Sequence, residues 1–317
     1  MKNQRRIIYF LRPWDFPAGG VATIYQHVEI LAQNGYQAFV ALSHKPNIDF
    51  YNSNAPLMIH GGKIEFKKGD IYVFPEQFID YMEALKYAQA RKIMFCQNQY
   101  YLPFSTNSKL GFKEFPVDSL LVSSKSIGNF MRDVYGLIDV PCIPYAIDRN
   151  FYISKKKKRQ IAFMPRKLPN DAAFIENTFK RKYKELSDIP WVSIDGMTKL
   201  EAANVMGESE VFLSLSYKDS FGLPPLEAMS CGCLVAGFHG DGGREYMNSH
   251  NGWWAETGDW LACINGLNQA FTVIDCGGAE LEKIKLGMEN TLTRYSFDNM
   301  KNKLLEYWDR EISSTYT

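Results

Sequence analysis

Two carboxylates eight residues apart, Asp219 and Glu227, enclose a segment that contains Gly222 and the consecutive prolines Pro224 and Pro225. Proline suits the start of a helix, because its φ is already helical and its missing N–H is not needed there. Free amide groups at a helix start bind anions, and Gly222 allows a ligand to approach the backbone closely. The amides predicted to be free are those of Gly222, Leu223, Leu226 and Glu227.

The two carboxylates themselves are suited to sugar hydroxyl groups. Glu227 is predicted to lie in the first helical turn, where the helix dipole favours a negative charge and its oxygens can accept hydrogen bonds from a polyol. Asp219 is expected to face the same crevice from the preceding loop. Amides for phosphate beside carboxylates for hydroxyl groups fit a nucleotide sugar. The alternative, that Glu227 only caps its helix and Asp219 only begins a turn, is disfavoured because Pro224 occupies the capping-box position that needs Ser or Thr.

Short apolar strands must position these residues. The runs VFLSLS (211–216) and LVAGF (234–238) predict two parallel neighbouring strands, with a short helix over Pro225–Cys231 between them. Ligands of such sheets bind beyond the carboxyl ends of the strands, and the loops Tyr217–Leu223 and His239–Gly243 leave those ends. Both loops are therefore expected at the site. His239 has two open roles, contact with the donor or closure of its turn.

The same alternation of strand and helix along the chain predicts an α/β fold with parallel sheets covered on both faces. Further strands are expected at 7–11, 38–42, 71–74, 93–96, 120–123, 161–164 and 191–194, and helices at 21–34, 76–90, 125–135, 171–186, 200–207 and 297–308. A polar stretch that ends in the basic run Lys155–Arg159 marks a domain boundary. We interpret this run as a solvated linker, with contact to anionic lipid or phosphate as the alternative.

Composition excludes several classes of protein. The 317 residues fit two domains, and 36 basic side chains almost balance 35 acidic ones, so no charge excess attracts nucleic acid. Six scattered cysteines indicate reduced core residues in a cytoplasmic protein, and the pair Cys231 and Cys233 lacks a second pair for zinc. No apolar stretch is long enough to span a bilayer, which leaves a peripheral membrane contact as an open alternative. Neither unit has a GxGxxG fingerprint, which disfavours hydride transfer.

The segment D-SFGLPPL-E (219–227) resembles the signature of retaining glycosyltransferases of the GT-B fold, particularly glycosyltransferase family 4. That family usually has Glu where this chain has Asp219. The resemblance implies that Glu227 binds the donor ribose and that Asp219 approaches the transferred sugar. It also implies two doubly wound Rossmann-like domains facing a cleft. The expected domains are an acceptor-binding domain over 1–149, a nucleotide-sugar-binding domain over 150–295, and a closing helix over 296–317 that packs back toward the first domain.

Other segments extend the resemblance. The stretch 161–167 matches a strand that ends in a diphosphate-binding Arg, which implies this role for Arg166, and Lys167 is a candidate substitute for a family Lys where this chain has Asp171. Pro17–Tyr36 resembles the family's N-terminal glycine-rich loop and helix, whereas a His of the first domain is replaced by Gln97 or Asn98. The predicted catalytic residues are Asp219, Arg166 and Lys167. The predicted binding residues are Glu227, Phe221, Gly222, Leu223, Gly19, Gly20, His239, Gly242 and Gly243.

The resemblance implies transfer of a sugar from a nucleotide-diphosphate sugar to a growing glycan or lipid-linked saccharide, with retention at the anomeric carbon and with neither metal nor cofactor. Cytoplasmic location follows, with peripheral contact at the inner membrane face left open. The alternative is a non-catalytic GT-B partner of an active glycosyltransferase, because Asp219, Asp171 and Gln97 are departures that such a protein would show. A sugar-nucleotide epimerase is a third interpretation. The nucleotide base, the sugar, the acceptor and the oligomeric state stay open.

Overall fold

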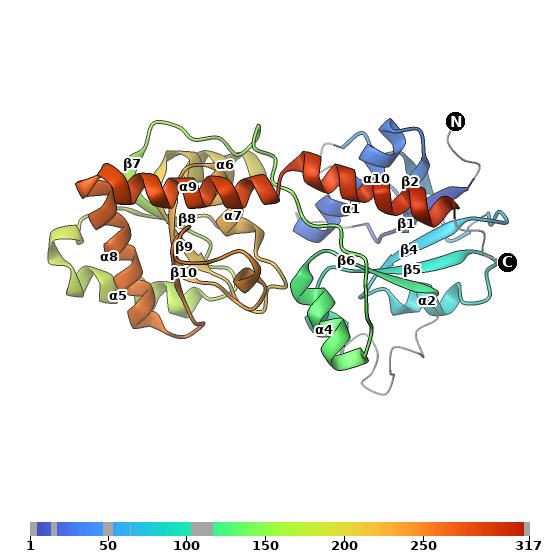
Figure 1. Cartoon of the computed structure of the whole chain (residues 1–317), viewed down its shortest axis with the longest axis horizontal. Helices are drawn as coiled ribbons and strands as arrows, with labels where there is room; N and C mark the ends of the chain where they lie inside the picture. Colours follow the sequence, from blue (N-terminus) through green and yellow to red (C-terminus); the bar gives the residue numbers. More distant parts are fainter. Residues whose placement is uncertain (1–4, 14–17, 47–52, 64, 103–116, 314–317) are drawn as a thin grey trace. The chain divides into compact units, whose positions relative to one another are not determined.

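The structure is a computed structural model that describes residues 5–13, 18–46, 53–63, 65–102 and 117–313. The described residues fall into two compact units, one within 1–145 and 298–317 and the other within 146–297 (Figure 1). Each unit contains one sheet whose strands are all parallel, as the sequence predicts. Pro17, where the resembling N-terminal segment begins, lies outside the described residues.

The sheet of the first unit has the strand order β3-β2-β1-β4-β5-β6. Its central strands are fully buried, which explains their near-continuous apolar sequences. Five of the six strands were predicted, and the short edge strand β3 was not, because its three residues carry no strong pattern. The strands are β1 (Arg6–Phe10), β2 (Gln37–Leu42), β3 (Leu57–Ile59), β4 (Ile71–Pro75), β5 (Arg91–Cys96) and β6 (Ser119–Val122).

Among the described residues of this unit, two helices lie between strands of its sheet and a third follows β6. They are α1 (Gly19–Gln33), α2 (Ile79–Ala84) and α4 (Lys125–Tyr135), and a 3₁₀ turn, η1, covers Gln99–Tyr101. The bounds of α4 agree with the prediction, because Ser124 caps its start by accepting a hydrogen bond from the Ile127 amide and Gly136 ends it in a left-handed conformation. The predicted helix over 76–90 is wrong in length, since only six residues form α2.

The last helix, α10 (Phe297–Ser313), packs within the first unit although it comes last in the chain. Trp308 is fully buried and its indole N–H lies 3.3 Å from the Tyr9 hydroxyl of β1. Arg91 Nε donates to Glu311 over 2.7 Å, which ties the start of β5 to the end of α10. The first unit therefore needs the C-terminal segment to complete its core.

The second unit has the strand order β11-β10-β9-β7-β8. Its strands are β7 (Lys158–Phe163), β8 (Trp191–Ser193), β9 (Ser209–Leu215), β10 (Leu234–Phe238) and β11 (Trp253–Ala255). Its helices are α5 (Pro169–Lys182), α6 (Lys199–Glu208), α7 (Leu223–Ser230), α8 (Trp260–Cys276) and α9 (Gly278–Arg294), with 3₁₀ turns η3 (Lys184–Leu186) and η4 (Gly242–Glu245). Helices α5 and α8 cover one face of the sheet and α6, α7 and α9 the other (Figure 1). The strands and helices predicted from apolar patterns do not include β11, α8 or α9.

The interpretation of Lys155–Arg159 as a solvated linker is wrong for its second half. Lys157 Nζ donates to the Ser209 carbonyl over 2.8 Å and to the Cys231 carbonyl over 2.6 Å. Arg159 lies in β7, pairs with Asp275 over 2.6 Å and stacks over the Phe271 ring. Internal carbonyl and carboxylate groups therefore take up much of this charge.

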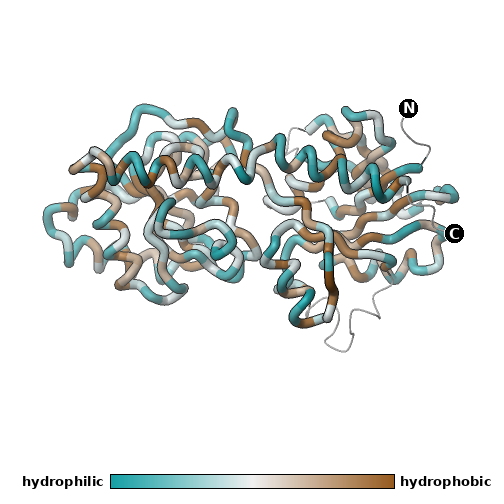
Figure 2. The backbone as a smooth tube through the Cα atoms, in the orientation of Figure 1, coloured by the Kyte–Doolittle hydropathy of each residue, from teal (hydrophilic) through white to brown (hydrophobic). Residues whose placement is uncertain are grey.

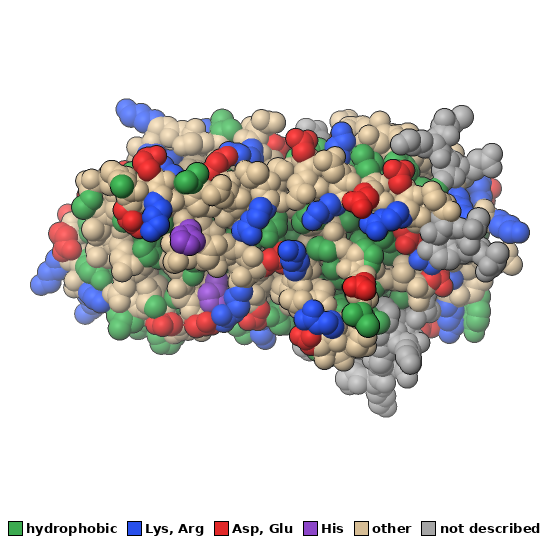
Figure 3. Space-filling view, in the orientation of Figure 1, with side chains coloured by type: hydrophobic (Ala, Val, Ile, Leu, Met, Phe, Trp, Pro, Cys, Tyr) green, Lys and Arg blue, Asp and Glu red, His purple; other side chains and the backbone are tan. Residues whose placement is uncertain are grey.

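Apolar residues follow the sheets, and polar residues follow the outer helices. In Figure 2 the strands are largely brown, whereas brown and teal alternate along α9 and α10. On the face drawn in Figure 3, basic and acidic side chains are interspersed, as expected from their balanced numbers. No helix within the described residues is both long enough and apolar enough to cross a membrane.

Candidate functional site

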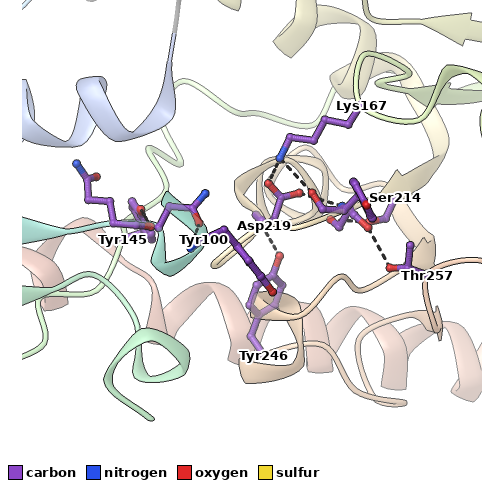
Figure 4. A network of polar contacts seen from close by, with 12 residues as sticks. Tyr100, Tyr145, Lys167, Ser214, Asp219, Tyr246 and Thr257 are labelled. Carbon is purple, nitrogen blue, oxygen red and sulfur yellow. Dashed lines mark hydrogen bonds and ion pairs between the residues drawn. The ribbon is translucent and has the colours of Figure 1, made fainter. Parts of the chain in front are cut away.

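Lys167 and Asp219 meet at the carboxyl ends of two paired strands. Lys167 follows β7 and Asp219 follows β9. The Lys167 ammonium forms an ion pair with Asp219 Oδ1, and the Tyr217 amide lies 3.3 Å from Asp219 Oδ2 (Figure 4). Both side chains remain partly exposed, so a ligand can reach them. The structure thus brings together two predicted catalytic residues that are 52 positions apart.

Arg166 lies beside this ion pair in the sequence and has an exposed side chain, which forms no ion pair with any described residue. The loop that carries Asp219 is bent at Lys218, whose φ of 49° is left-handed. Non-glycine residues adopt this conformation only where the surrounding structure imposes it, often at functional loops. Because the Arg166 side chain is exposed, an anion at this edge of the sheet can pair with it.

The start of α7 supplies two free backbone amides. Gly222 is the N-cap with a φ of 82°, and its carbonyl accepts a hydrogen bond from the Tyr246 hydroxyl (Figure 4). The helix begins at Leu223, two residues earlier than predicted, with prolines in its second and third positions. Amides from the fourth helical residue onward bond to carbonyls of the helix. The prediction of free amides therefore holds for Gly222 and Leu223 and is wrong for Leu226 and Glu227.

Glu227 is the fifth residue of α7, so its predicted place in the first turn is also wrong. The dipole of the helix acts mainly within the first turn and is weaker here. The Tyr152 hydroxyl and the Lys199 ammonium, at the start of α6, are near enough to the Glu227 carboxylate to affect its pKa. Burial raises the pKa of Glu227, whereas both neighbours act to lower it. Tertiary neighbours, more than the helix start, thus set the environment of this carboxylate.

Phe221 supports the site loop through its ring. Its side chain is buried, and its ring centroid lies 5.2 Å from that of Tyr246 and 5.0 Å from that of Tyr295. Aromatic rings at such separations contribute to packing beyond the area they bury. Only the main chain of Phe221 is therefore placed to touch a ligand.

Gly242 allows two loops of the site to touch. A Cβ at this position would lie 2.0 Å from the Ser220 carbonyl carbon and 2.2 Å from the Phe221 amide nitrogen. The Gly242 amide also donates to the Asp219 carbonyl over 2.9 Å. The loop after β10 therefore packs directly on the loop that carries Asp219. Gly243, also buried, lies against the end of the Met247 side chain, four residues along the same segment.

His239 makes the turn contact that was one of its two expected roles. Its Nδ1 faces the Gly240 carbonyl, and its Nε2 lies 3.3 Å from Glu256 Oε1, a carboxylate that also pairs with Arg244. The ring is largely buried. The structure gives the local role of His239 and does not test contact with a donor.

The remaining predicted binding residues, Gly19 and Gly20, begin α1 in the first unit. The Gln97 side chain donates to the Gly20 carbonyl over 3.1 Å, and the Gln97 amide donates to Glu76 over 3.0 Å. Burial raises the pKa of Glu76 to about 7. Gln97, which replaces the family His, thus joins the end of β5 to the start of α1.

Residues 196–273 match the model of the protein family described as Glycosyl transferases group 1. The second unit carries a glycosyltransferase group 1 domain. This glycosyltransferase chain is 28% identical over 251 residues to an alpha-1,6-glucosyltransferase of Actinobacillus pleuropneumoniae serotype 7, a match that covers 77% of this chain and 74% of the relative.

Solved structures share the fold over nearly the whole chain. HepE from Anabaena in complex with UDP matches with a TM-score of 0.71 and 13% identity, covering 96% of this chain and 100% of HepE. A glycosyltransferase from Rickettsia africae ESF-5 matches with a TM-score of 0.68 and 13% identity, covering 99% of this chain and 100% of its own. The prediction of two GT-B Rossmann-like domains is confirmed.

Most of the predicted donor site falls inside the glycosyltransferase domain, whereas Arg166 and Lys167 precede it in the chain. Sequence reasoning missed Tyr246, because it bonds to Gly222 from a position 24 residues away and no local pattern indicates this contact. Among the described residues, no group of three or more His, Cys, Asp or Glu side chains is arranged to hold a metal ion.

Proposed function

We propose that this glycosyltransferase transfers a hexosyl group from a nucleotide-diphosphate sugar, with UDP-glucose as the first donor to test. The main support is the meeting of Lys167 and Asp219 beside the free amides of Gly222 and Leu223. Two relatives support the choice of donor, the alpha-1,6-glucosyltransferase and HepE, which has been solved in complex with UDP-glucose. In this proposal residues 150–295 bind the donor and 1–149 bind the acceptor near Gly19 and Gly20.

The proposed reaction breaks the bond between the anomeric carbon and the donor phosphate oxygen. The negative charge that develops on the leaving diphosphate is stabilised by Arg166, Lys167 and the two amides; preorganised groups of this kind are each worth about 2.7–4 kcal/mol. Before the donor binds, Asp219 partly neutralises Lys167. The arriving diphosphate competes for this lysine and frees Asp219 to accept hydrogen bonds from the sugar.

Retention of configuration is carried over from the resemblance of 219–227 to the retaining family. An acceptor hydroxyl oxygen then forms the new bond on the face that the diphosphate leaves, and its proton passes to a leaving phosphate oxygen. We also propose metal-independent transfer to a glycan or lipid-linked saccharide in the cytoplasm, with peripheral membrane contact as an open alternative. NMR of the product's anomeric centre tests retention, and transfer that survives EDTA tests metal independence.

Replacing Arg166 or Lys167 by Ala tests the proposed site. Each variant is expected to turn over UDP-glucose at least about 100-fold more slowly than the unmodified chain, because one hydrogen-bond donor to the leaving group is lost. The melting temperature should stay near that of the unmodified chain, since neither side chain is buried. Arg181→Ala, on the last turn of α5, is the matched control and should retain full activity. Unchanged turnover in both site variants would contradict the assignment.

One observation favours the alternative of a non-catalytic partner. Asp171, which stands where the family has a Lys, accepts a hydrogen bond from the Trp260 indole over 2.7 Å, and Gln97 is bonded to Gly20. Two departures from the family thus serve internal contacts. Transfer or donor hydrolysis by the purified chain decides between the two functions, and formation of a free altered sugar without acceptor would identify an epimerase.

A further inference from the structure

Tyr246 is a buried side chain beside the site for which the proposed reaction gives no role. It is 1% exposed, and its hydroxyl donates a hydrogen bond to the Gly222 carbonyl (Figure 4). Burial raises the pKa of this hydroxyl, so it keeps the proton that it donates. The bond joins the segment after β10 to the residue at which α7 begins.

The rest of Tyr246 is held by the core of the second unit. Its ring centroid lies 5.2 Å from that of Phe221 and 5.7 Å from that of Tyr295. Its carbonyl accepts a hydrogen bond over 2.7 Å from the side chain of Asn251, which is fully buried and also donates to Thr291 of α9 over 2.9 Å. The Tyr246 hydroxyl therefore has a fixed position.

The bond to the Gly222 carbonyl controls the direction of the Leu223 amide. These two groups belong to one planar peptide unit, and in a trans unit the C=O and the N–H point in opposite directions. A donor that holds the carbonyl on one side thus directs the Leu223 N–H to the other side, away from the Tyr246 hydroxyl. A hydrogen bond to the carbonyl also polarises the peptide, which makes its N–H a stronger donor.

The start of α7 needs this support. Gly222 has a left-handed conformation with a φ of 82° and a ψ of 79°, and glycine has a wide range of accessible conformations. Pro224 and Pro225 follow Leu223 and have no N–H, so they add no hydrogen bonds to the first turn. A carbonyl oxygen has two lone pairs and can accept the Tyr246 bond beside the first bond of the helix. Tyr246 therefore supplies a constraint that the two prolines cannot.

We propose that Tyr246 is a positioning residue that holds the peptide between Gly222 and Leu223 with its N–H directed at the donor diphosphate. The inference rests on the proposed function, since it takes the Leu223 amide as a ligand of the leaving diphosphate. Tyr246 itself does not touch the donor. Its effect should appear in the part of the affinity that the phosphates supply, and not in the part that the nucleoside supplies.

The test is calorimetric binding to the full chain. The tightest-binding of UDP, ADP and GDP is compared with its nucleoside, whose weaker binding is measured by competition against the nucleotide. The dissociation constant of the nucleoside divided by that of the nucleotide gives the phosphate contribution as a ratio. In Tyr246→Phe this ratio should fall about 10-fold, as expected for a lost hydrogen bond to a charged group, whereas the affinity for the nucleoside should change less than about twofold.

A second variant removes the amide hydrogen itself. Leu223→Pro has no N–H at this position, and proline is well tolerated at the first position of a helix. It should lower the ratio by a similar factor. Adding Tyr246→Phe to this variant should not change the ratio further, because both changes act on one hydrogen bond to the phosphates. Placing 4-aminophenylalanine at position 246 restores a donor and should restore the ratio.

Tyr295→Phe is the matched control. Tyr295 packs against Tyr246 in the same ring cluster, and its hydroxyl donates to a different acceptor, Glu245, over 3.1 Å. The ratio in this variant should equal that of the unmodified chain. If Tyr246→Phe does not fold, 4-methylphenylalanine at position 246 replaces it, because the methyl group fills the volume of the hydroxyl and cannot donate a hydrogen bond.

The outcomes separate the two proposals. Binding of no nucleotide would overturn the proposed function and this inference with it. A ratio that is unchanged in Tyr246→Phe would overturn the inference alone, whether or not the ratio falls in Leu223→Pro. Loss of affinity in Tyr246→Phe by the same factor for nucleotide and nucleoside would show a merely structural role, and would overturn it also.

Discussion

At the scale of single residues, the site carboxylates depend on partners that are remote in sequence. Asp219 is paired with Lys167, and the pKa of Glu227 is affected by the nearby side chains of Tyr152 and Lys199. Lys167 follows β7, whereas both carboxylates come from the segment between β9 and β10. A change at Lys167 should therefore affect the same ligand as a change at Asp219.

A second residue-scale feature is that two titratable side chains of the first unit, His27 and Glu76, are buried. His27 is fully buried, stacks on Phe95, and has no hydrogen-bond partner for either ring nitrogen among the described residues. Burial lowers its pKa from 6.5 to about 3. Burial raises the pKa of Glu76 from 4.5 to about 7. His27 is thus kept neutral, and Glu76 is kept protonated over part of the acid range.

These two groups predict opposite pH dependences of stability. Between pH 3 and 6.5 the unfolded chain protonates His27 and the folded chain does not, so this group makes the free energy of unfolding rise with pH. Between pH 4.5 and 7 the folded chain keeps the Glu76 proton that the unfolded chain loses, so this group makes it fall. Each slope is about 1.4 kcal/mol per pH unit, and they should largely cancel between pH 4.5 and 6.5.

Urea unfolding at several pH values measures this balance. In His27→Leu the free energy of unfolding should fall with rising pH across the overlap, because only Glu76 remains, whereas in Glu76→Gln it should rise. The two variants serve as controls for each other. Parallel pH profiles in both variants and the unmodified chain would refute the burial argument.

At the scale of elements, the site depends on close contact between two loops. The loop after β10 can touch the loop after β9 only because position 242 has no side chain. A second glycine, Gly237 within β10, also lies at a close approach of two backbones: its φ is 132°, and it lies against Ser214 of β9. Glycine at these places is required by the approach of one backbone to another.

Gly242→Ala should therefore push the two loops apart. We expect the free energy of unfolding to fall by about 1–3 kcal/mol through overpacking and nucleotide affinity to fall as the amides of Gly222 and Leu223 shift. Gly128→Ala is the control: it lies inside α4, where a Cβ would meet only Val122 Cγ2 at 3.8 Å. That change should stabilise the chain by about 0.5–1 kcal/mol. Denaturant titration and calorimetry measure both effects, and equal stability of the two variants would count against the packing role of Gly242.

At the scale of the whole molecule, the order of the chain does not follow the order of the units. The chain completes the second unit at Phe297 and then returns to the first, where α10 contributes Leu304 and Trp308 to the core. The Tyr36 hydroxyl donates to Asp309 over 2.6 Å, so the end of the chain is also tied to the segment before β2. Damage to the C-terminal helix should therefore be felt in the N-terminal sheet.

Trp308→Ala tests this connection. Loss of a fully buried tryptophan is expected to cost the first unit about 3–5 kcal/mol. Hydrogen exchange should accelerate in β1, β4 and β5, whereas protection of β9 and β10 should change little. Trp308→Phe keeps most of the apolar volume and should cost less. Equal loss of protection in both sheets would argue against the assignment of α10 to the first unit.

Local patterns in the sequence determined much of this protein. Apolar runs predicted nine of the described strands because a parallel strand buried on both faces leaves little choice of residue. Ser124 and Gly136 marked the ends of α4 because caps act on neighbouring backbone groups. The glycine, prolines and acids of 219–227 predicted a nucleotide-sugar site because they lie within nine residues, and the resemblance of this segment to a known family implied a glycosyltransferase.

Only the tertiary structure decided which residues complete that site. Nothing local indicates that Lys167 pairs with Asp219 or that position 242 must be glycine. These contacts form because parallel strands bring together the ends of segments that are far apart in the sequence, by 52 residues in the case of Lys167 and Asp219. The exact start of α7 was also undecided, since two prolines fit several positions in a first turn and the Tyr246 bond to Gly222 helps to select one.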